Sequence, residues 1–111
     1  MNSRDLSELA RRTVDRVSVT LAVLLWSVDD RESQLHHYED DVLRLVAEHR
    51  GRVLTRVRNI DAADHPTETQ VIEFTDQSAF DAYMTDPRRV AMAYRRDACV
   101  ARTEVWRVDS V

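Results

Sequence analysis

The densest run of side chains able to carry out chemistry is His36-His37-Tyr38-Glu39-Asp40-Asp41. An imidazole titrates near neutrality, so it can accept a proton from an acidic phenol or an activated C–H bond at physiological pH. We expect His37 or His36 to act as such a general base, because His37 adjoins Tyr38, which the helical pattern places inward. The alternative is that both histidines lie on a solvated helix face.

The same run holds two pairs of possible metal ligands at helical spacing, His36 with Asp40 and His37 with Asp41. Residues four apart share a helix face, but the local sequence lacks the third and fourth ligands of a typical site. We therefore predict no metal site. Nucleotide cofactors are not expected either, because a chain with one glycine has neither a phosphate-cradling loop nor a dinucleotide fingerprint.

Aromatic side chains are spread along the chain at positions that the hydrophobic pattern turns inward. Most of them are expected to pack in the core, but hydroxyl-bearing rings at inward positions also suit an aromatic or polyketide-like ligand held by stacking and a few hydrogen bonds. A histidine that precedes Pro66 in a long loop could swing over the mouth of a pocket. The candidate ligand-binding residues are Trp26, Tyr38, Tyr83, Tyr94 and His65.

The charge balance and the single cysteine limit the classes of function. The 16 basic residues are all arginine and are outnumbered by 20 acidic residues, giving a net charge of −4. This balance disfavours nucleic-acid binding, which requires a basic face. Cys99 has no partner for an internal disulfide, so we expect a buried thiol in a cytoplasmic protein. No apolar run approaches the roughly 20 residues of a membrane span, so no membrane partner is expected.

The elements that must position these groups follow from the hydrophobic periodicity. Apolar residues alternate from Val17 onward, which predicts a first strand. Asp29 and Glu32 then have the spacing of a capping box that begins a helix. This helix extends to about His49, and Gly51, the only glycine, is expected to end it. Its apolar stripe comprises Leu35, Tyr38, Val42, Leu45, Val46 and His49.

The second half of the chain predicts further strands over residues 53–60, 67–74 and 103–108. Between the last two of these strands, Thr75 or Asp76 is expected to cap a helix that Pro87 interrupts. A further helix resumes at about Arg88. Its inward residues are expected to be Val90, Ala91, Tyr94 and Ala98.

The predicted order is a short N-terminal helical extension over residues 1–16 and a β-α-β-β-α-β domain over residues 17–111. This order is typical of a ferredoxin-like α+β fold, with four antiparallel strands and two helices on one face of the sheet. Both strand faces carry apolar residues, Trp26 and Trp106 among them, so an uncovered sheet would expose an apolar patch. Pairing two sheets about a two-fold axis removes this patch, and we expect a homodimer.

With these elements in place, the chain resembles the dimeric α+β barrel superfamily, and within it most closely the DUF1330-like group. The resemblance extends from about Val19 to Val108. Such barrels include cofactor-free monooxygenases, haem-degrading enzymes, lactone isomerases and polyketide cyclases, with pockets between helices and sheet. The matching segments are Gly51-Arg52-Val53-Leu54-Thr55-Arg56, Val71-Ile72-Glu73-Phe74-Thr75, Ala82-Tyr83-Met84-Thr85-Asp86-Pro87 and Arg96-Asp97-Ala98.

The resemblance adds Arg96 to the candidate catalytic residues, because related sequences commonly have arginine there. A guanidinium can bind a carboxylate or enolate oxygen bidentately; the alternative is a structural ion pair with Asp97, Glu73 or Glu104. We expect a small-molecule enzyme that acts by proton transfer on a hydrophobic, aromatic or polyketide-derived substrate, through cyclisation, isomerisation or cofactor-free oxygenation. The alternatives are a non-catalytic ligand-binding or stress-associated protein and a haem-degrading enzyme.

Overall fold

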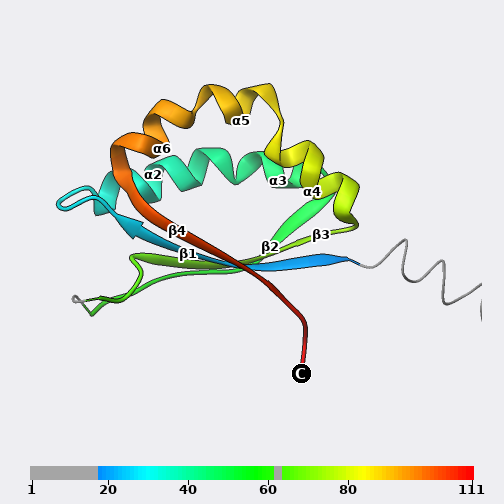
Figure 1. Cartoon of the computed structure of the whole chain (residues 1–111), viewed down its shortest axis with the longest axis horizontal. Coiled ribbons are helices and arrows are strands. Elements are labelled where there is room, and N and C mark those ends of the chain that lie inside the picture. Colours follow the sequence, from blue (N-terminus) through cyan, green and yellow to red (C-terminus); the bar gives the residue numbers. More distant parts are fainter. Residues whose placement is uncertain (1–17, 62–63) are drawn as a thin grey trace, which may run out of the picture.

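The computed structural model describes residues 18–61 and 64–111, so the helix expected over residues 1–16 lies outside the described residues. The β-α-β-β-α-β order is as predicted, with each helical segment divided into shorter helices (Figure 1). The elements are β1 (Val19–Ser27), α2 (Glu32–Val42), α3 (Arg44–Glu48), β2 (Gly51–Arg58), β3 (Glu68–Phe74), α4 (Gln77–Met84), α5 (Pro87–Ala91), α6 (Ala93–Cys99) and β4 (Val100–Val108).

The four strands form one antiparallel sheet in the order β2-β3-β1-β4. Successive side chains of a strand point to opposite faces, and the register brings Leu21 of β1 opposite Ile72 of β3. Both side chains are buried, because the helices cover this inner face of the sheet (Figure 1). The ferredoxin-like α+β fold is therefore confirmed.

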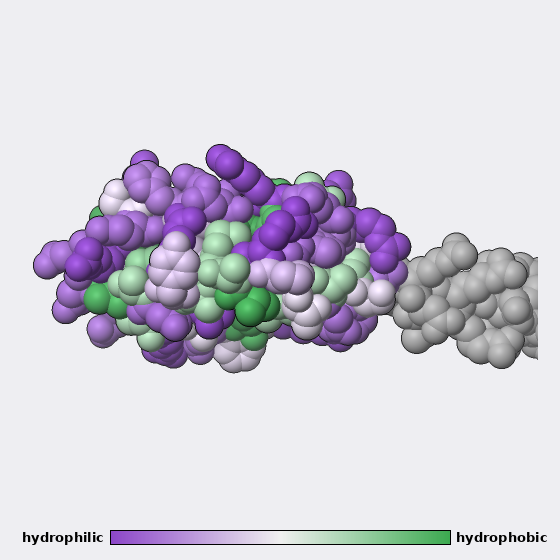
Figure 2. Space-filling view, turned by 90° about the horizontal axis from the view of Figure 1, so that it is seen from above, coloured by the Kyte–Doolittle hydropathy of each residue, from purple (hydrophilic) through white to green (hydrophobic). Residues whose placement is uncertain are grey.

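The outer face of the sheet carries apolar side chains that the described part of the chain leaves uncovered. Trp106 lies opposite Ala22, and Val57 lies opposite Thr69, so all four side chains belong to this face. Trp106 is 58% exposed and Val57 is 53% exposed. From the helix side, by contrast, the surface is mostly hydrophilic, with apolar side chains showing between the charged ones (Figure 2).

The start of the first helix differs from the prediction. The N-cap residue is Arg31, which makes no capping hydrogen bond with its side chain, so the capping box expected at Asp29 is wrong. Asp30 instead has a φ of 65° and forms a turn in which the backbone N–H of Arg31 donates to Val28. The chain needs this tight turn to leave β1, and the helix begins only after the turn is complete.

The second helical segment begins as predicted. The carboxylate of Asp76 accepts a hydrogen bond from the backbone N–H of Ala79 at 2.8 Å, which caps α4. Pro87 separates α4 from α5 and occupies the first turn of α5, where its missing N–H costs nothing. Asp86, held in an extended conformation by the proline ring, caps that helix through the backbone N–H of Arg88.

Gly51 occupies its position for a different reason from the one predicted. The left-handed residue at the end of α3 is Arg50, with a φ of 57°, whereas Gly51 is the first residue of β2 and has no positive φ. A Cβ atom at position 51 would lie 2.7 Å from both Phe74 and Val46. Glycine is required here because the strand passes directly against two buried side chains.

Substitutions at these two neighbouring positions should separate packing from backbone conformation. Gly51→Ala is expected to lower the free energy of unfolding by about 1–3 kcal/mol, because the added methyl overpacks against Phe74 and Val46. Arg50→Gly should change it by less than about 1 kcal/mol, because relief of the left-handed conformation is offset by greater freedom in the unfolded chain. Urea unfolding measures both. If Gly51→Ala left the free energy of unfolding unchanged and Arg50→Gly raised it strongly, packing would not be the constraint at this junction.

Candidate functional site

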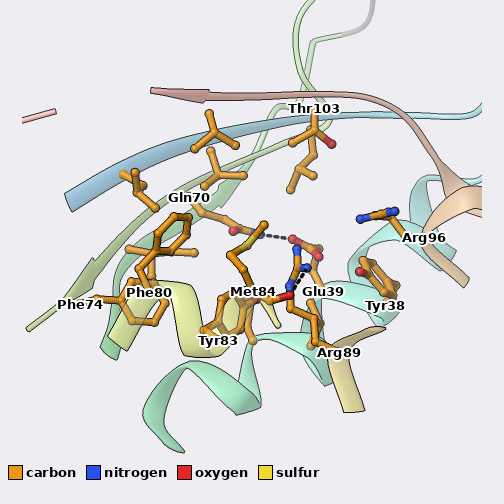
Figure 3. A pocket seen from close by; sticks show the side chains of 17 residues that line it. Tyr38, Glu39, Gln70, Phe74, Phe80, Tyr83, Met84, Arg89, Arg96 and Thr103 are labelled. Carbon is orange, nitrogen blue, oxygen red and sulfur yellow. Dashed lines mark hydrogen bonds between the residues drawn. The ribbon is translucent and has the colours of Figure 1, made fainter. Parts of the chain in front are cut away.

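A cavity of about 370 Å³ lies between the inner face of the sheet and the helices. Its walls are mainly apolar, with side chains such as Val23, Ile72 and Phe80, and it reaches the surface near the exposed Met84 and Val105. A small set of polar side chains enters these apolar walls (Figure 3). They are Tyr38, Glu39, Gln70, Tyr83, Arg89, Arg96 and Thr103.

Glu39 is the buried acid of this cavity. It lies on α2 one residue beyond Tyr38, on the stripe formed with Leu35 and Val42, and is only 5% exposed. Its Oε1 accepts a hydrogen bond from Gln70 Nε2 at 2.7 Å (Figure 3). The pKa of Glu39 is raised from 4.5 to about 7, chiefly by burial and also by the nearby charge of Glu68, while the Gln70 hydrogen bond opposes the shift. Near neutral pH this carboxyl can therefore both accept and donate a proton.

A second buried carboxylate lies behind Gln70. Gln70 Nε2 also donates to Glu68 Oε2 at 2.6 Å, and both residues are 1% exposed. Arg56 binds Glu68 through Nε at 2.8 Å, and His36 Nδ1 lies 2.6 Å from Glu68 Oε1. Burial alone would raise the pKa of Glu68, but the hydrogen bonds from Arg56, Gln70 and His36 lower it overall. Glu68 therefore stays ionised, and its charge disfavours ionisation of Glu39.

Two arginines extend from the second helical segment into the cavity, Arg89 from α5 beside Glu39 and Arg96 from α6 near Tyr38 (Figure 3). Both guanidiniums favour the ionised form of the Tyr38 hydroxyl, although burial raises its pKa overall. Burial likewise raises the pKa of Tyr83, opposed by a hydrogen bond from Arg89. Three of the residues predicted from the sequence thus lie around one cavity: Arg96, Tyr38 and Tyr83.

The remaining candidates lie elsewhere. His36 and His37 line a separate hollow at the surface, beside Asp40 and Arg56. Trp26 and His65 line another hollow, near the loop between β2 and β3. The indole N–H of Trp26 donates to the backbone oxygen of Asp64 at 3.0 Å.

Tyr94 is 73% exposed and does not line the cavity, so its predicted inward orientation is wrong. Val90 and Ala98 are exposed as well. The helix is interrupted at Met92, between α5 and α6, and this break changes the helical phase. It turns Met92 and Cys99 toward the core instead, and the burial of the Cys99 thiol is confirmed.

Sequence reasoning did not single out Glu39, Gln70 or Arg89. One signal was available for Glu39, because it follows Leu35 by four residues and so lies on the apolar stripe of the helix. A charged residue at such a position is buried and needs a partner. The partner, Gln70, lies 31 residues further along the chain, and no local pattern links the two.

In the part of the chain that the structure describes, no helix is long and apolar enough to cross a membrane. Over the same residues, no group of three or more histidine, cysteine or acidic side chains is arranged to hold a metal ion.

The fold and the cavity define a ferredoxin-like α+β protein with a pocket between helices and sheet. The chain belongs to the family described as Domain of unknown function (DUF1330), whose profile matches residues 20–110. No curated protein matches the chain well enough to count as a relative.

Solved structures share this fold at low sequence identity. A Rhodopseudomonas palustris protein of unknown function aligns over 100% of this chain and 95% of its own, with a TM-score of 0.70 and 14% identity. A dimeric protein of unknown function with a ferredoxin-like fold, from Bacteroides fragilis, covers 82% and 96%, with a TM-score of 0.63 and 16% identity. SnoaB, a cofactor-independent oxygenase from Streptomyces nogalater, covers 85% and 95%, with a TM-score of 0.63 and 12% identity. At these identities the likeness shows the fold alone.

The raised pKa of Glu39 predicts a pH-dependent cost to stability. The unfolded carboxyl ionises at about 4.5 and the folded one at about 7, so the folded state loses stability as pH rises through this interval. Glu39→Gln removes that loss while keeping an acceptor for Gln70. The variant should unfold like the wild type near pH 4.5 and be more stable by on the order of 3 kcal/mol at pH 8. Denaturant unfolding across this range checks it, and a difference that does not vary with pH would contradict it.

Proposed function

We propose that this protein is an enzyme that transfers protons on a hydrophobic, aromatic or polyketide-derived small molecule, with Glu39 as the general base. The observation that carries the proposal is a buried carboxyl, with a pKa of about 7, inside an otherwise largely apolar cavity. A base whose pKa lies near the working pH combines a useful fraction of ionised form with enough basicity to remove a proton. Glu39 thus takes the role first expected of His36 or His37.

The first step is the same for each reaction considered. The Glu39 carboxylate takes a proton from an acidic C–H or phenolic O–H group of the substrate, which leaves an enolate or phenolate and a neutral Glu39. The negative charge forms in the cavity that Arg89 and Arg96 line, where a fixed positive charge stabilises it more than water would. Return of the proton to another carbon is isomerisation. Attack of the enolate carbon on a carbonyl carbon is cyclisation, and reaction with O₂ is oxygenation.

The cavity walls also support a hydrophobic substrate. Phe74, Phe80 and Tyr83 form a cluster of tilted rings. The ring centroid of Tyr83 lies 5.3 Å from that of Phe74, and the ring centroid of Phe80 lies 5.5 Å from it. Aromatic surface of this kind, with few polar groups, is typical of pockets for flat apolar ligands. The described function of SnoaB, a cofactor-independent oxygenase on the same fold, is consistent with this chemistry.

The base can be tested without the natural substrate. In 5-nitrobenzisoxazole, a flat aromatic probe, a general base removes the C3 proton as the N–O bond breaks, which gives a coloured cyanophenolate. The wild type should accelerate this ring opening, with a rate that rises with pH to a plateau above the Glu39 pKa of about 7. Glu39→Gln should lower the rate at least about 100-fold, the usual contribution of a general base.

His37→Gln is the matched control, because His37 is exposed and lies outside the cavity. Its rate should stay within about twofold of the wild type if Glu39 is the base. Equal rates for Glu39→Gln and the wild type, or loss of activity in His37→Gln, would overturn the assignment of the base. Binding of the probe without any turnover would favour the alternative, a non-catalytic ligand-binding protein.

We further propose that two copies of the chain associate through the outer faces of their sheets. Trp106, Val57 and Val108 are exposed on this face. Ion pairs of Arg52 with Glu73 and of Arg102 with Glu104 lie among these residues. An apolar patch with polar neighbours is typical of an interface between subunits.

Trp106→Arg should convert the dimer to a monomer, because it replaces the largest exposed apolar side chain of the outer face with a charge. Val90→Arg is the matched control, since Val90 is also 58% exposed but lies on the helix side. Light scattering should give about twice 12.9 kDa for the wild type and the control, and about 12.9 kDa for Trp106→Arg. A wild-type monomer at micromolar concentration would contradict the proposal.

A further inference from the structure

Arg89 is a guanidinium without a counter-ion in the cavity. Within residues 18–61 and 64–111 it takes part in no salt bridge, and its Nε atom is buried without a hydrogen-bond partner. It contacts the backbone oxygen of Met84 through a 3.4 Å hydrogen bond, and it contacts Tyr83 both at the hydroxyl and at the ring, whose centroid lies 5.1 Å away. The neighbouring Arg88, by contrast, binds both Asp86 and Glu48. The chain therefore neutralises one of two adjacent arginines and leaves the other facing the cavity.

Arg96 is the second positive charge of the cavity, and its ion pair is weak. Its Nε atom lies 3.7 Å from Asp97, whose side chain is 74% exposed and therefore well screened by water. The guanidiniums of Arg96 and Arg89 both act on the Tyr38 hydroxyl, which places them around the same part of the cavity (Figure 3). Both guanidiniums thus line one part of the cavity, where Glu39 is the one carboxyl group among the described lining residues.

Glu39 compensates these charges only in part, because its pKa of about 7 leaves it largely neutral below that pH, although the charge of Arg89 favours its ionised form. Its carboxyl is bound by Gln70, and among the described residues it forms no salt bridge with either arginine. The walls of the cavity therefore hold two positive charges and at most one negative charge, although the protein as a whole has a net charge of −4. A charged group in an apolar site requires a partner, and this need is greatest at Arg89, whose Nε is buried, because the side chain of Arg96 is 43% exposed. The partner that this site lacks is an anion.

We infer that the ligand of this cavity is a hydrophobic acid, a ring-containing molecule with one ionised, planar oxygen group that Arg89 and Arg96 bind together. Planar carboxylates and enolates of 1,3-dicarbonyl groups present two oxygens to a guanidinium fork, which is the geometry that arginine recognises best. The inference rests on the proposed function in taking the cavity as the substrate site. It adds that the substrate enters already charged, whereas Glu39 acts on a different, uncharged group of the same molecule.

Two pairs of bicyclic probes test the charge and the kind of head group. 2-Naphthoate carries a carboxylate, and 2-naphthamide is its neutral isostere; 4-hydroxycoumarin is an enolate near neutral pH, and coumarin is its neutral counterpart. Calorimetry at pH 6.5 should show that at least one of the two anions binds at least about tenfold more tightly than its neutral partner, as expected for charge-assisted hydrogen bonds. Preference for naphthoate assigns a carboxylate head group, and preference for hydroxycoumarin assigns an enolate.

Variants attribute the preference to the two arginines. Arg89→Leu and Arg96→Leu should each weaken binding of the anion about tenfold or more and leave the neutral probe nearly unchanged. Arg89→Lys, which keeps the charge without the fork, should fall between wild type and Arg89→Leu. Arg44→Leu is the control, because Arg44 is a surface arginine on α3 outside the cavity. Melting curves confirm that each variant is folded.

The outcomes separate this inference from the proposed function. Equal binding of anion and neutral probe, or an anion preference that survives in Arg89→Leu and Arg96→Leu, would overturn the inference. Ring opening of 5-nitrobenzisoxazole that depends on Glu39 would then still support the proposed function. Conversely, an anion preference that depends on Arg89 and Arg96, in a wild-type protein that does not accelerate this ring opening, would support the inference and overturn the role of Glu39 as base.

Discussion

A single amide nitrogen of Gln70, donating to both Glu39 and Glu68, is the interaction on which the site depends. Two carboxylates held this close in a buried place cannot both ionise easily, and their other partners decide which of them does. Glu68 is also bound by Arg56 and His36 and keeps its charge. Among the described residues, Glu39 is hydrogen-bonded only by Gln70, and burial and the charge of Glu68 raise its pKa to about 7. An unequal supply of partners turns one acid into a structural ion and the other into a proton-exchanging group.

The partners that lie close to each side chain also decide the roles of the arginines. The chain contains 16 basic residues, and composition makes no distinction among them. Arg56 and Arg88 are neutralised by carboxylates that lie against them, and they hold strands and helices together. Arg89 forms no salt bridge among the described residues, and it lines the cavity. The two faces of the sheet divide in a similar way: the inner face builds the cavity, and the outer face carries the exposed apolar side chains through which we propose that two copies associate.

Much of the fold could be predicted, because its determinants are local. Asp76 and Pro87 act on the backbone within three residues of themselves, and both behave as the sequence indicates. The alternating apolar residues of β1 and β3 likewise predict these two strands directly. Gly51 was assigned to the correct junction for the wrong reason, since its constraint comes from Phe74 across the sheet and not from its own φ. The predicted phase of the last helix is wrong, because the helix is interrupted at Met92.

By itself, the sequence determined the order of elements, the antiparallel sheet with its helices on one face, and the family to which the chain belongs. It also contained Arg96, Tyr38 and Tyr83, which the structure places around one cavity. The tertiary structure alone decided which acid is buried and which arginine lacks a partner. Glu39 acquires its raised pKa from burial and from the charge of Glu68, which lies on a strand about 30 residues further along the chain. A pKa depends on what surrounds a group in space, and a pattern of neighbours along the chain does not contain that information.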